Sequence, residues 1–315
     1  MNKMVKVSLA GLAAAAMIIP ASANTTWYGR ANYEIQSKMD GEYIDGVANA
    51  SRLGVRGSQD LDNGLKAVFM FESSVNTDNS GGAFAGRQAW TGIQGDFGTL
   101  TLGHQNDAFQ GMLGNLNNWS LADVDVSTST NMAGMGFQPF SDGRTSKAIK
   151  FAGKADDLSY AISFAKEVDT TPGDEETVFA PALAVRFTGV ENLDLRFGYR
   201  TKDDGDYTQI ALTALYSMGD LKVGFGFDTI TQDIAGTDVD LTTMLIPVEY
   251  NLGNGLSVNA ALVRWDLDGN VDDININVGV KKNLGQRTWA YASVASFGSD
   301  GEDRSDWGIG IRHDF

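Results

Sequence analysis

The chain has 315 residues and a formal net charge of −16, from 40 acidic residues against 24 Lys and Arg, and it contains no cysteine. This excess of acid argues against nucleic acid as a partner, because binding a phosphate backbone requires a dense basic surface. An exported form of the protein would have to hold its fold without disulfides.

The first 23 residues have the layout of a secretory signal. Lys3 and Lys6 precede an apolar run from Val7 to Ile19, and Ala21-Ser22-Ala23 offers small residues for cleavage. We therefore expect residues 1–23 to be removed, although an N-terminal anchor helix is an alternative. The mature chain would then carry 22 basic and 40 acidic residues, a net charge of −18. Residues 24–315 show no linker or composition shift, so we predict a single domain there.

From residue 27 onward, apolar and polar residues alternate in short segments, which is the period of a β-strand. Before residue 106 we predict five strands, at 27–36, 48–59, 65–75, 85–95 and 99–105. After residue 143 we predict eleven, at 144–152, 158–167, 177–188, 193–202, 206–218, 221–232, 239–250, 256–267, 273–284, 287–298 and 305–315. Sixteen strands is an even number, so the first and last can pair and close the sheet.

The connections between these strands alternate in character. One set is short, such as the Asn63-Gly64 turn, and the other is mostly longer, polar and rich in Asp, such as 37–47 and 168–176. In an up-and-down sheet alternate connections lie at the same end. Short turns at one end and long loops at the other are typical of outer-membrane barrels. After residue 23 no apolar run approaches the ~20 residues of a membrane helix, so only a closed barrel could span a membrane.

Alternation alone does not tell whether the apolar faces point into a core or out to lipid. A soluble sandwich, the alternative fold, turns them inward, whereas a membrane barrel turns them outward. Strands of about ten residues and polar faces rich in Arg and Gly favour the barrel. So do aromatic residues near strand ends on the apolar faces, as in an interfacial girdle: Trp27, Tyr33, Tyr199, Tyr216, Tyr250, Trp289 and Trp307. We predict an all-β transmembrane antiparallel up-and-down barrel of 16 strands.

The segment 106–143 has 38 residues and no sustained apolar alternation. A loop of this length inside a compact domain is usually functional. Because its flanking segments are predicted to be neighbouring strands, we expect it to fold inward and narrow the lumen. The sequence therefore suggests a diffusion channel whose constriction is this loop.

Three stretches resemble the trimeric, sixteen-stranded general porins of Gram-negative bacteria. Ser51–Gly57, followed by Asp60-Leu61 and Gly64–Val68, resembles their second hairpin, and Arg87 with Gly92 and Gly95–Gly103 resembles the next. Trp307–Phe315 resembles their terminal strand. The resemblance implies a homotrimer of water-filled barrels in outer-membrane lipid and lipopolysaccharide, passing ions and small hydrophilic solutes without a cofactor. It also implies that the barrel-assembly machinery reads Phe315.

In that family, basic residues on the early strands face acids on the third loop. The matching wall residues are Arg52, Arg56, Lys66 and Arg87, and strand parity adds Arg30. The candidate loop acids are Asp107, Asp123, Asp125 and Asp142, of which the mid-loop Asp123 and Asp125 are favoured. Such an arrangement sets a transverse field across a narrow aqueous gap. The family's Pro-Glu-Phe-Gly-Gly stretch is absent, and its nearest counterpart, Gly136–Phe140, has no acid. From the net charge we expect a weak cation preference.

Other functions have less support in the sequence. A porin selective for a sugar or an anion is the nearest alternative, and Trp119, Phe137 and Phe140 leave an aromatic path open. An adhesin role of the loops is compatible with transport. An outer-membrane enzyme is disfavoured because the sequence has no evident nucleophile–His–acid set. The run from Asp266 to Asp272 begins like a calcium loop but lacks its glycine and glutamate positions, and His104 and His313 are isolated, so we predict no metal site.

Overall fold

A computed structural model describes residues 24–38, 43–48, 50–76, 84–113, 139–140, 144–168, 177–202, 206–234, 236–268, 271–298 and 304–315. Besides a short 3₁₀ turn, η1 (Asp62–Gly64), and one helix, α2 (Ala108–Leu113), these residues are mostly strand. The strands are β1 (Asn24–Lys38), β2 (Tyr43–Val47), β3 (Arg52–Asp60), β4 (Lys66–Val75), β5 (Phe84–Gly95), β6 (Gly98–Gln105), β7 (Thr145–Ala155), β8 (Leu158–Val168), β9 (Thr177–Val190), β10 (Leu193–Lys202), β11 (Tyr207–Met218), β12 (Leu221–Asp233), β13 (Asp238–Gly253), β14 (Leu256–Leu267), β15 (Val271–Gly285), β16 (Thr288–Phe297) and β17 (Arg304–Asp314).

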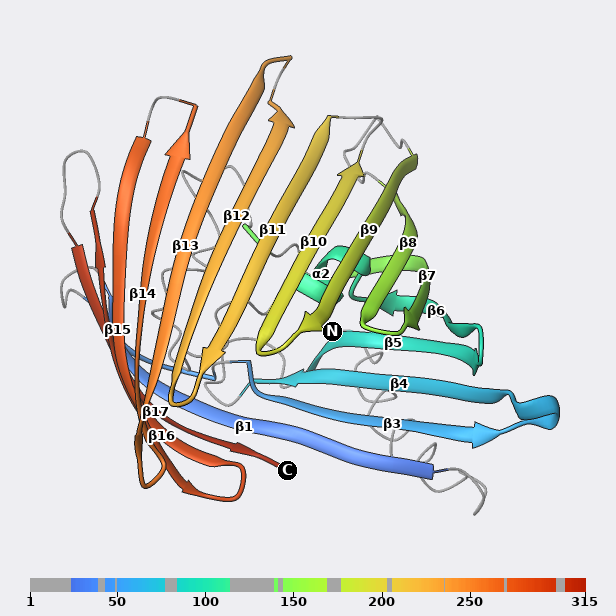
Figure 1. Cartoon of the computed structure of the whole chain (residues 1–315), viewed down its shortest axis with the longest axis horizontal. Coiled ribbons are helices and arrows are strands. Elements are labelled where there is room, and N and C mark those ends of the chain that lie inside the picture. Colours follow the sequence, from blue (N-terminus) through green and yellow to red (C-terminus); the bar gives the residue numbers. More distant parts are fainter. Residues whose placement is uncertain are drawn as a thin grey trace, which may run out of the picture.

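These strands form one sheet that closes on itself (Figure 1). Each strand from β3 to β17 pairs antiparallel with its neighbours in sequence. The seam is made by β1, which pairs antiparallel with β17 from Arg30 opposite Asp314 to Ser37 opposite Trp307. A closed sheet leaves no unpaired edge. The predicted antiparallel all-β barrel is confirmed, and the soluble-sandwich alternative is wrong.

Two of the strands share a single position in the barrel. β1 pairs with β2 over Glu34–Lys38 and with β3 over Asn24–Arg30. Between β2 and β3 the chain bends at Ala50, which has a φ of 50°. Ser51 bridges the gap, because its Oγ accepts a hydrogen bond from the Asn32 N–H at 2.9 Å and donates one to the Asn32 carbonyl at 2.8 Å. With β2 and β3 counted as one strand position, the barrel has the predicted 16 strands.

This interrupted position is where the predicted element boundaries were wrong. Part of the predicted loop 37–47 is the strand β2, and the predicted single strand 48–59 begins only at Arg52. A period of two continues across a bend of a few residues without a visible break, so alternation alone did not reveal it. Elsewhere the strands lie close to their predicted ranges.

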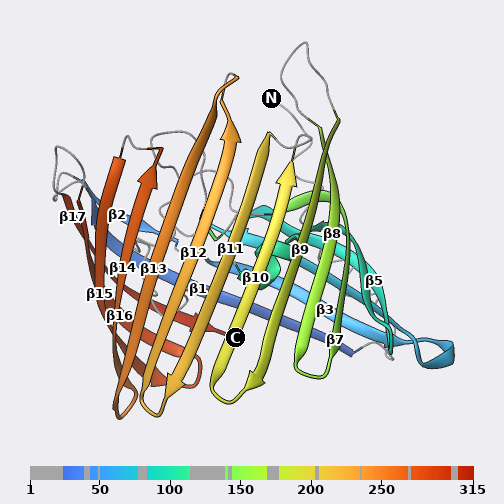
Figure 2. The ribbon, with the colours of Figure 1, turned by 45° about the horizontal axis from the view of Figure 1, so that its top comes forward.

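Short turns gather at one end of the barrel, as Figure 2 shows for the hairpins β7–β8 and β9–β10 at the lower edge. Asp156 and Asn192 in these two turns have φ values of 49° and 62°. In the predicted Asn-Gly turn between β3 and β4, Asn63 has a φ of 60°. Asn and Asp tolerate this left-handed conformation better than most residues, which explains why they occupy the turns.

The apolar faces of the strands point outward. On β17, Ile309 and Ile311 are 54% and 52% exposed, whereas Asn277 on the inner face of β15 is fully buried. A water-soluble protein would pay heavily for such a belt of exposed aliphatic side chains, and a lipid environment would not. Among the described residues, no helix is long and apolar enough to cross a membrane.

Six of the seven predicted girdle aromatics are exposed on this outer surface, namely Trp27, Tyr33, Tyr199, Tyr216, Tyr250 and Trp307. The seventh, Trp289, was assigned to the wrong face, because it points inward and lies under the guanidinium of Arg312 at 5.2 Å. The outer face of β16 carries Ala290, Ala292 and Val294. Because the outward-facing residues of β16 are small, the outer face is no more apolar than the inner face, and alternation did not reveal which face meets lipid.

Both described ends of the long segment 106–143 lie against the inner wall. α2 packs on β9 and β10 inside the barrel (Figure 1). A Cβ at Gly198 would overlap Leu113 and Phe109, so this wall position accepts the helix only because it is glycine. Phe140, near the other end, belongs to the same buried cluster, together with inward-facing residues of β13 and β14. The stretches 114–138 and 141–143 lie outside the described residues.

Candidate functional site: the inner wall of the barrel

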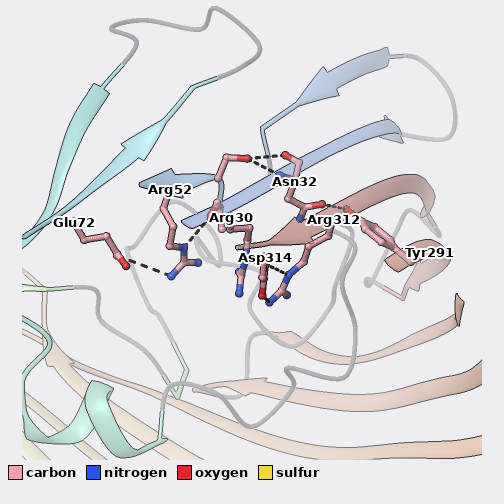
Figure 3. A network of polar contacts seen from close by, with 9 residues as sticks. Arg30, Asn32, Arg52, Glu72, Tyr291, Arg312 and Asp314 are labelled. Atoms are coloured by element: carbon pink, nitrogen blue, oxygen red, sulfur yellow. Dashed lines mark hydrogen bonds and ion pairs between the residues drawn. The ribbon is translucent and has the colours of Figure 1, made fainter. Parts of the chain in front are cut away.

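Arginines from β1, β3 and β17 converge on the inner wall near the seam (Figure 3), and Arg87 on β5 joins them through its contact with Glu72. Arg30 lies opposite Arg52 across the β1–β3 pair and opposite Asp314 across the β1–β17 pair. Directly opposed residues on one face of an antiparallel pair are close neighbours. The barrel closure therefore brings the first and last strands of the sheet into one charged site, which we call the seam cluster: Arg30, Arg52, Glu72, Arg87, Arg144, Arg312 and Asp314.

One carboxylate of the seam cluster, Asp314, holds two arginines. Arg30 Nε lies 3.1 Å from Asp314 Oδ1. Arg312 donates from Nε to Oδ1 at 2.8 Å and from Nη2 to Oδ2 at 2.5 Å. The Arg312–Asp314 pair is therefore bidentate, a geometry that fixes the plane of the Arg312 guanidinium. Arg312 is therefore held by two neighbours, because its guanidinium binds Asp314 and also lies over the Trp289 ring.

The other carboxylate, Glu72 on β4, is nearly buried at 8% exposure and collects three donors. Arg87 Nε is 2.7 Å from Glu72 Oε1, the Tyr28 hydroxyl is 3.0 Å from Oε2, and Arg52 Nη1 is 4.0 Å from Oε1. The contacts of Arg87 and Tyr28 are hydrogen bonds to an ionised acceptor, whereas Arg52 at 4.0 Å forms an ion pair. Glu72 thus positions both Arg52 and Arg87.

Arg87 reaches this site through a β-bulge. In the β4–β5 pair, Glu72 opposes Gln88 and Ser73 opposes Gly86, so Arg87 is the extra residue. Parity in the sequence puts Arg87 and Trp90 on opposite faces. In the structure Trp90 opposes Met70, which shares the inner face with Glu72, and the bulge turns Arg87 to that face as well. Re-aiming a side chain is a common effect of bulges.

Arg144 adds a fifth guanidinium just before β7. Burial lowers its pKa, and the positive charge of Arg87 lowers that pKa further, while the negative charge of Glu72 opposes the shift. These electrostatic influences show that Arg144 shares the field of the seam cluster. Among its described members the cluster holds five arginines and two carboxylates.

Two predicted wall residues lie apart from the contacts of the seam cluster. Arg56 lies four residues after Arg52 on β3, nearer the short turns, with its guanidinium 5.1 Å above the Tyr28 ring. Lys66 lies at the β3–β4 turn, where its Nζ is 3.5 Å from Asp60 Oδ1 and both side chains are half-exposed or more. Lys66 is therefore at the rim of the barrel.

The long segment is anchored to the wall by a second network around Arg200 on β10. Asp107 Oδ2 lies 3.6 Å from Arg200 Nη1, and its Oδ1 accepts the Gln110 N–H at 2.6 Å at the start of α2. The Arg200 guanidinium also lies 5.3 Å above the Phe109 ring. A single arginine thus contacts both the residue that precedes α2 and the helix itself.

The same network extends to the far end of the segment. Arg200 Nε donates to Gln209 Oε1 at 2.8 Å, and Gln209 Nε2 donates to Asp228 Oδ2 at 2.8 Å. Asp228 Oδ2 also accepts the Phe140 N–H at 3.0 Å. Since Arg200, Gln209 and Asp228 are each at most 1% exposed, this chain of contacts is a buried polar bridge between the two ends of the segment.

The structure separates the predicted acids into two groups. Asp107 anchors α2 to Arg200 and has no described contact with the seam cluster. Asp123, Asp125 and Asp142 lie outside the described residues. Sequence reasoning missed Glu72, Arg312 and Asp314, although strand parity places Glu72 on the inner face with Lys66, and Arg312 with Gly308 and Gly310. Sequence reasoning also missed Arg200, because nothing in the β10 sequence distinguishes an arginine that lines the lumen from one that anchors the segment 106–143.

Comparison with known proteins agrees with this architecture. A sequence model of the Gram-negative porin family matches residues 5–303. The major outer membrane protein P.IB of Neisseria gonorrhoeae is 30% identical over 125 residues, which is 36% of each chain. An outer membrane porin protein of Bordetella pertussis is 28% identical over 217 residues, which cover 67% of this chain and 49% of the relative. The matches thus span less than two thirds of these relatives.

Solved porin structures share the fold. The anion-selective porin from Comamonas acidovorans superposes with a TM-score of 0.75 at 20% identity, covering 93% of this chain and all of that one. OmpT of Vibrio cholerae, described as a trimer form, superposes with a TM-score of 0.74 at 16% identity, covering 93% of this chain and all of that one. The closed barrel, its outward apolar faces and the family match over nearly the whole sequence agree, and the chain is a bacterial outer-membrane protein of the Gram-negative porin family.

Proposed function

We propose that this protein is a passive diffusion pore for ions and small hydrophilic solutes. The observation that carries the proposal is the division of the barrel into an outer apolar surface and an inner wall with charged and polar side chains. Such a barrel provides a polar route through a lipid bilayer. Porins act as channels, which disfavours the enzymatic alternative.

We further propose that segment 106–143 forms the constriction opposite the seam cluster. Support comes from its two described ends, which pack on β9–β10 and on β12 inside the barrel. The basic side of the constriction would consist of Arg30, Arg52 and Arg87, with Arg56 beside them. Asp123, Asp125 and Asp142 remain the proposed acidic side, Asp107 serves as an anchor, and Lys66 lies at the rim, away from the constriction.

The charge of the seam cluster favours an anion preference over the weak cation preference expected from net charge. Selectivity depends on the charges that line the narrow part of a pore rather than on the total charge. The seam cluster holds five arginines and two carboxylates, an excess of three positive charges. The anion selectivity named for the Comamonas porin gives a precedent on the same fold. An anion-preferring pore is therefore our second, more specific proposal.

Planar-bilayer recordings test both the pore proposal and the anion-preference proposal. We expect open-channel currents, and a reversal potential under a KCl gradient that reports chloride over potassium. Arg30→Gln together with Arg52→Gln should lower this preference roughly twofold or more, since two positive charges on the inner wall are lost in a partly screened medium. Lys66→Gln removes a charge at the rim and should leave the preference near the parent value. Absence of any conductance would reject the pore, and a cation-preferring parent would reject the anion proposal alone.

The assembly is proposed on the basis of the relatives. We propose a homotrimer in outer-membrane lipid and lipopolysaccharide, supported by the trimer form of the Vibrio structure. Insertion of conductance in groups of three equal steps would support a trimer, and single independent steps would oppose it. We also propose that the barrel-assembly machinery recognises Phe315, the terminal residue of the seam.

A further inference from the structure

A second charged group lies on the inner wall near the short-turn end, on β12, β13 and β15. Glu249 bridges two lysines: its Oε1 is 3.2 Å from Lys222 Nζ and its Oε2 is 2.7 Å from Lys281 Nζ. The register places Lys222 directly opposite Glu249, so the bridge is built into the sheet. An ammonium has three N–H donors, and each of these contacts uses one.

These three residues line a hollow in the wall. The hollow has a volume of about 220 Å³, and the other polar side chains of its lining are those of Asp220, Asn251, Ser257, Asn283 and Trp289. Sites for drug-sized ligands usually measure ~300–1,000 Å³, so this one suits a smaller molecule. The indole of Trp289 is covered by Arg312 at 5.2 Å, which brings a third cation to the edge of the hollow.

The hydrogen-bonding groups of the hollow are mostly donors. The side-chain oxygens of Asn251 and Asn283 already accept the N–H groups of Gly253 and Gly285, at 3.0 and 2.9 Å. No described residue accepts a hydrogen bond from either amide NH₂ group. Two ammonium groups and two amide NH₂ groups therefore line a site with two carboxylates, Glu249, which is held between the lysines, and Asp220 in the β11–β12 turn.

The hollow is also connected to the seam cluster. Arg312 covers Trp289 on one side and is bound to Asp314 on the other, and Asp314 holds Arg30. A negatively charged solute moving from Arg30 and Arg52 toward the short-turn end would thus meet Arg312 and then the two lysines. Successive sites of moderate strength suit permeation, because a solute must be able to leave each one.

We propose that this hollow is a binding site for small polyhydroxylated carboxylates, the class of the sugar acids. The ammonium groups would hold the carboxylate, and the two asparagine amides would donate to the hydroxyl oxygens. Glu249 orients the lysines, and Glu249 and Asp220 together weaken the binding of an anion, so that the solute is released. The inference rests on the proposed pore function, since it gives that pore a solute subsite.

The test uses gluconate as the probe and sorbitol, a polyol of the same chain length without the carboxylate, as its neutral counterpart. We expect gluconate to interrupt single-channel current, and calorimetry of the purified protein to detect its binding, with sorbitol much weaker in both. Lys222→Ala with Lys281→Ala should weaken gluconate binding roughly five- to tenfold, because charge-assisted contacts are lost. Glu249→Gln should tighten binding, because the competing carboxylate is removed while its shape is retained.

Lys282→Ala is the matched control. It removes the same charge one residue away, on a side chain that is exposed and donates to the Asn254 carbonyl at 2.6 Å. Gluconate binding should not change in this variant. Equal binding of gluconate and sorbitol, or unchanged binding in the double lysine variant, would overturn the site while leaving the pore proposal intact if the channels conduct. A protein that does not conduct but binds gluconate would overturn the pore alone.

Discussion

At the scale of single residues, the inner wall is organised by carboxylates that each hold more than one cation. Asp314 holds Arg30 and Arg312, Glu72 holds Arg87 and faces Arg52, and Glu249 holds two lysines. A carboxylate in this role fixes the direction of the cations around it and offsets part of their charge. The electrostatic field at each of these clusters therefore depends on the balance between its cations and its carboxylates, and not on the number of cations alone.

Glu72→Gln tests this view. The amide keeps the shape of the side chain and can still accept from Arg87, but the cluster gains one net positive charge. We expect a larger chloride preference than in the parent, measured as a shift in reversal potential under a KCl gradient. Glu191→Gln, which removes the same charge in the exposed β9–β10 turn, should cause no comparable shift. An unchanged preference in Glu72→Gln would show that the seam cluster does not face the ion path.

At the scale of elements, the long segment is held by one buried arginine rather than by the helix α2 alone. A helix of six residues has little stability of its own. Its position depends on apolar packing at Gly198 and on Arg200, which contacts Asp107, Phe109 and Gln209. The Gln209–Asp228–Phe140 contacts extend the same anchor to the other end of the segment.

Arg200→Met should loosen this anchor. Removing one partner of a buried ion pair leaves the other uncompensated, at a cost of about 3–5 kcal/mol in typical cases. We expect greater open-channel current noise and a lower heat-unfolding temperature. Arg186→Met, on the neighbouring strand β9, removes an arginine that is 44% exposed and paired with Asp194. This variant should change the current noise and the unfolding temperature much less. Open-channel noise equal to the parent in Arg200→Met would mean that the segment is fixed by other contacts.

The sequence predicted the elements better than their faces. Strand number and rhythm followed from alternation and turn residues, because a period of two and Asn-Gly chemistry are local properties. The face of Arg87 depended on a bulge, and that of Trp289 was hidden because the outer side of its strand carries mostly small residues, such as Ala290 and Ala292. On β13 and β14 both faces are apolar, since Leu241, Leu245 and Trp265 point inward into the cluster that contains Phe140. Such contacts join residues about a hundred positions apart, and no local pattern reveals them.

At the scale of the whole molecule, the closure of the barrel creates the charged site. Arg30 and Arg312 are 282 positions apart in the sequence and meet at Asp314 only because β1 pairs with β17. The terminal residue completes this seam: the Phe315 N–H donates to the Gly29 carbonyl and the Gly29 N–H donates to the Phe315 carbonyl, both at 3.1 Å. The Phe315 ring lies against Gly29, where a Cβ would overlap it.

These two contributions of Phe315 can be separated. Phe315→Ala removes the ring and keeps both backbone hydrogen bonds, whereas deletion of Phe315 removes the ring and the bonds. We therefore expect the temperature at which the folded barrel unfolds in detergent, followed by gel mobility, to fall in the order parent, Phe315→Ala, deletion. Ile311→Ala, an equally exposed residue of the outer face, controls for the loss of apolar area. If the deletion unfolds at the same temperature as Phe315→Ala, the last pair of backbone bonds does not stabilise the seam, and the contribution of Phe315 is confined to its side chain.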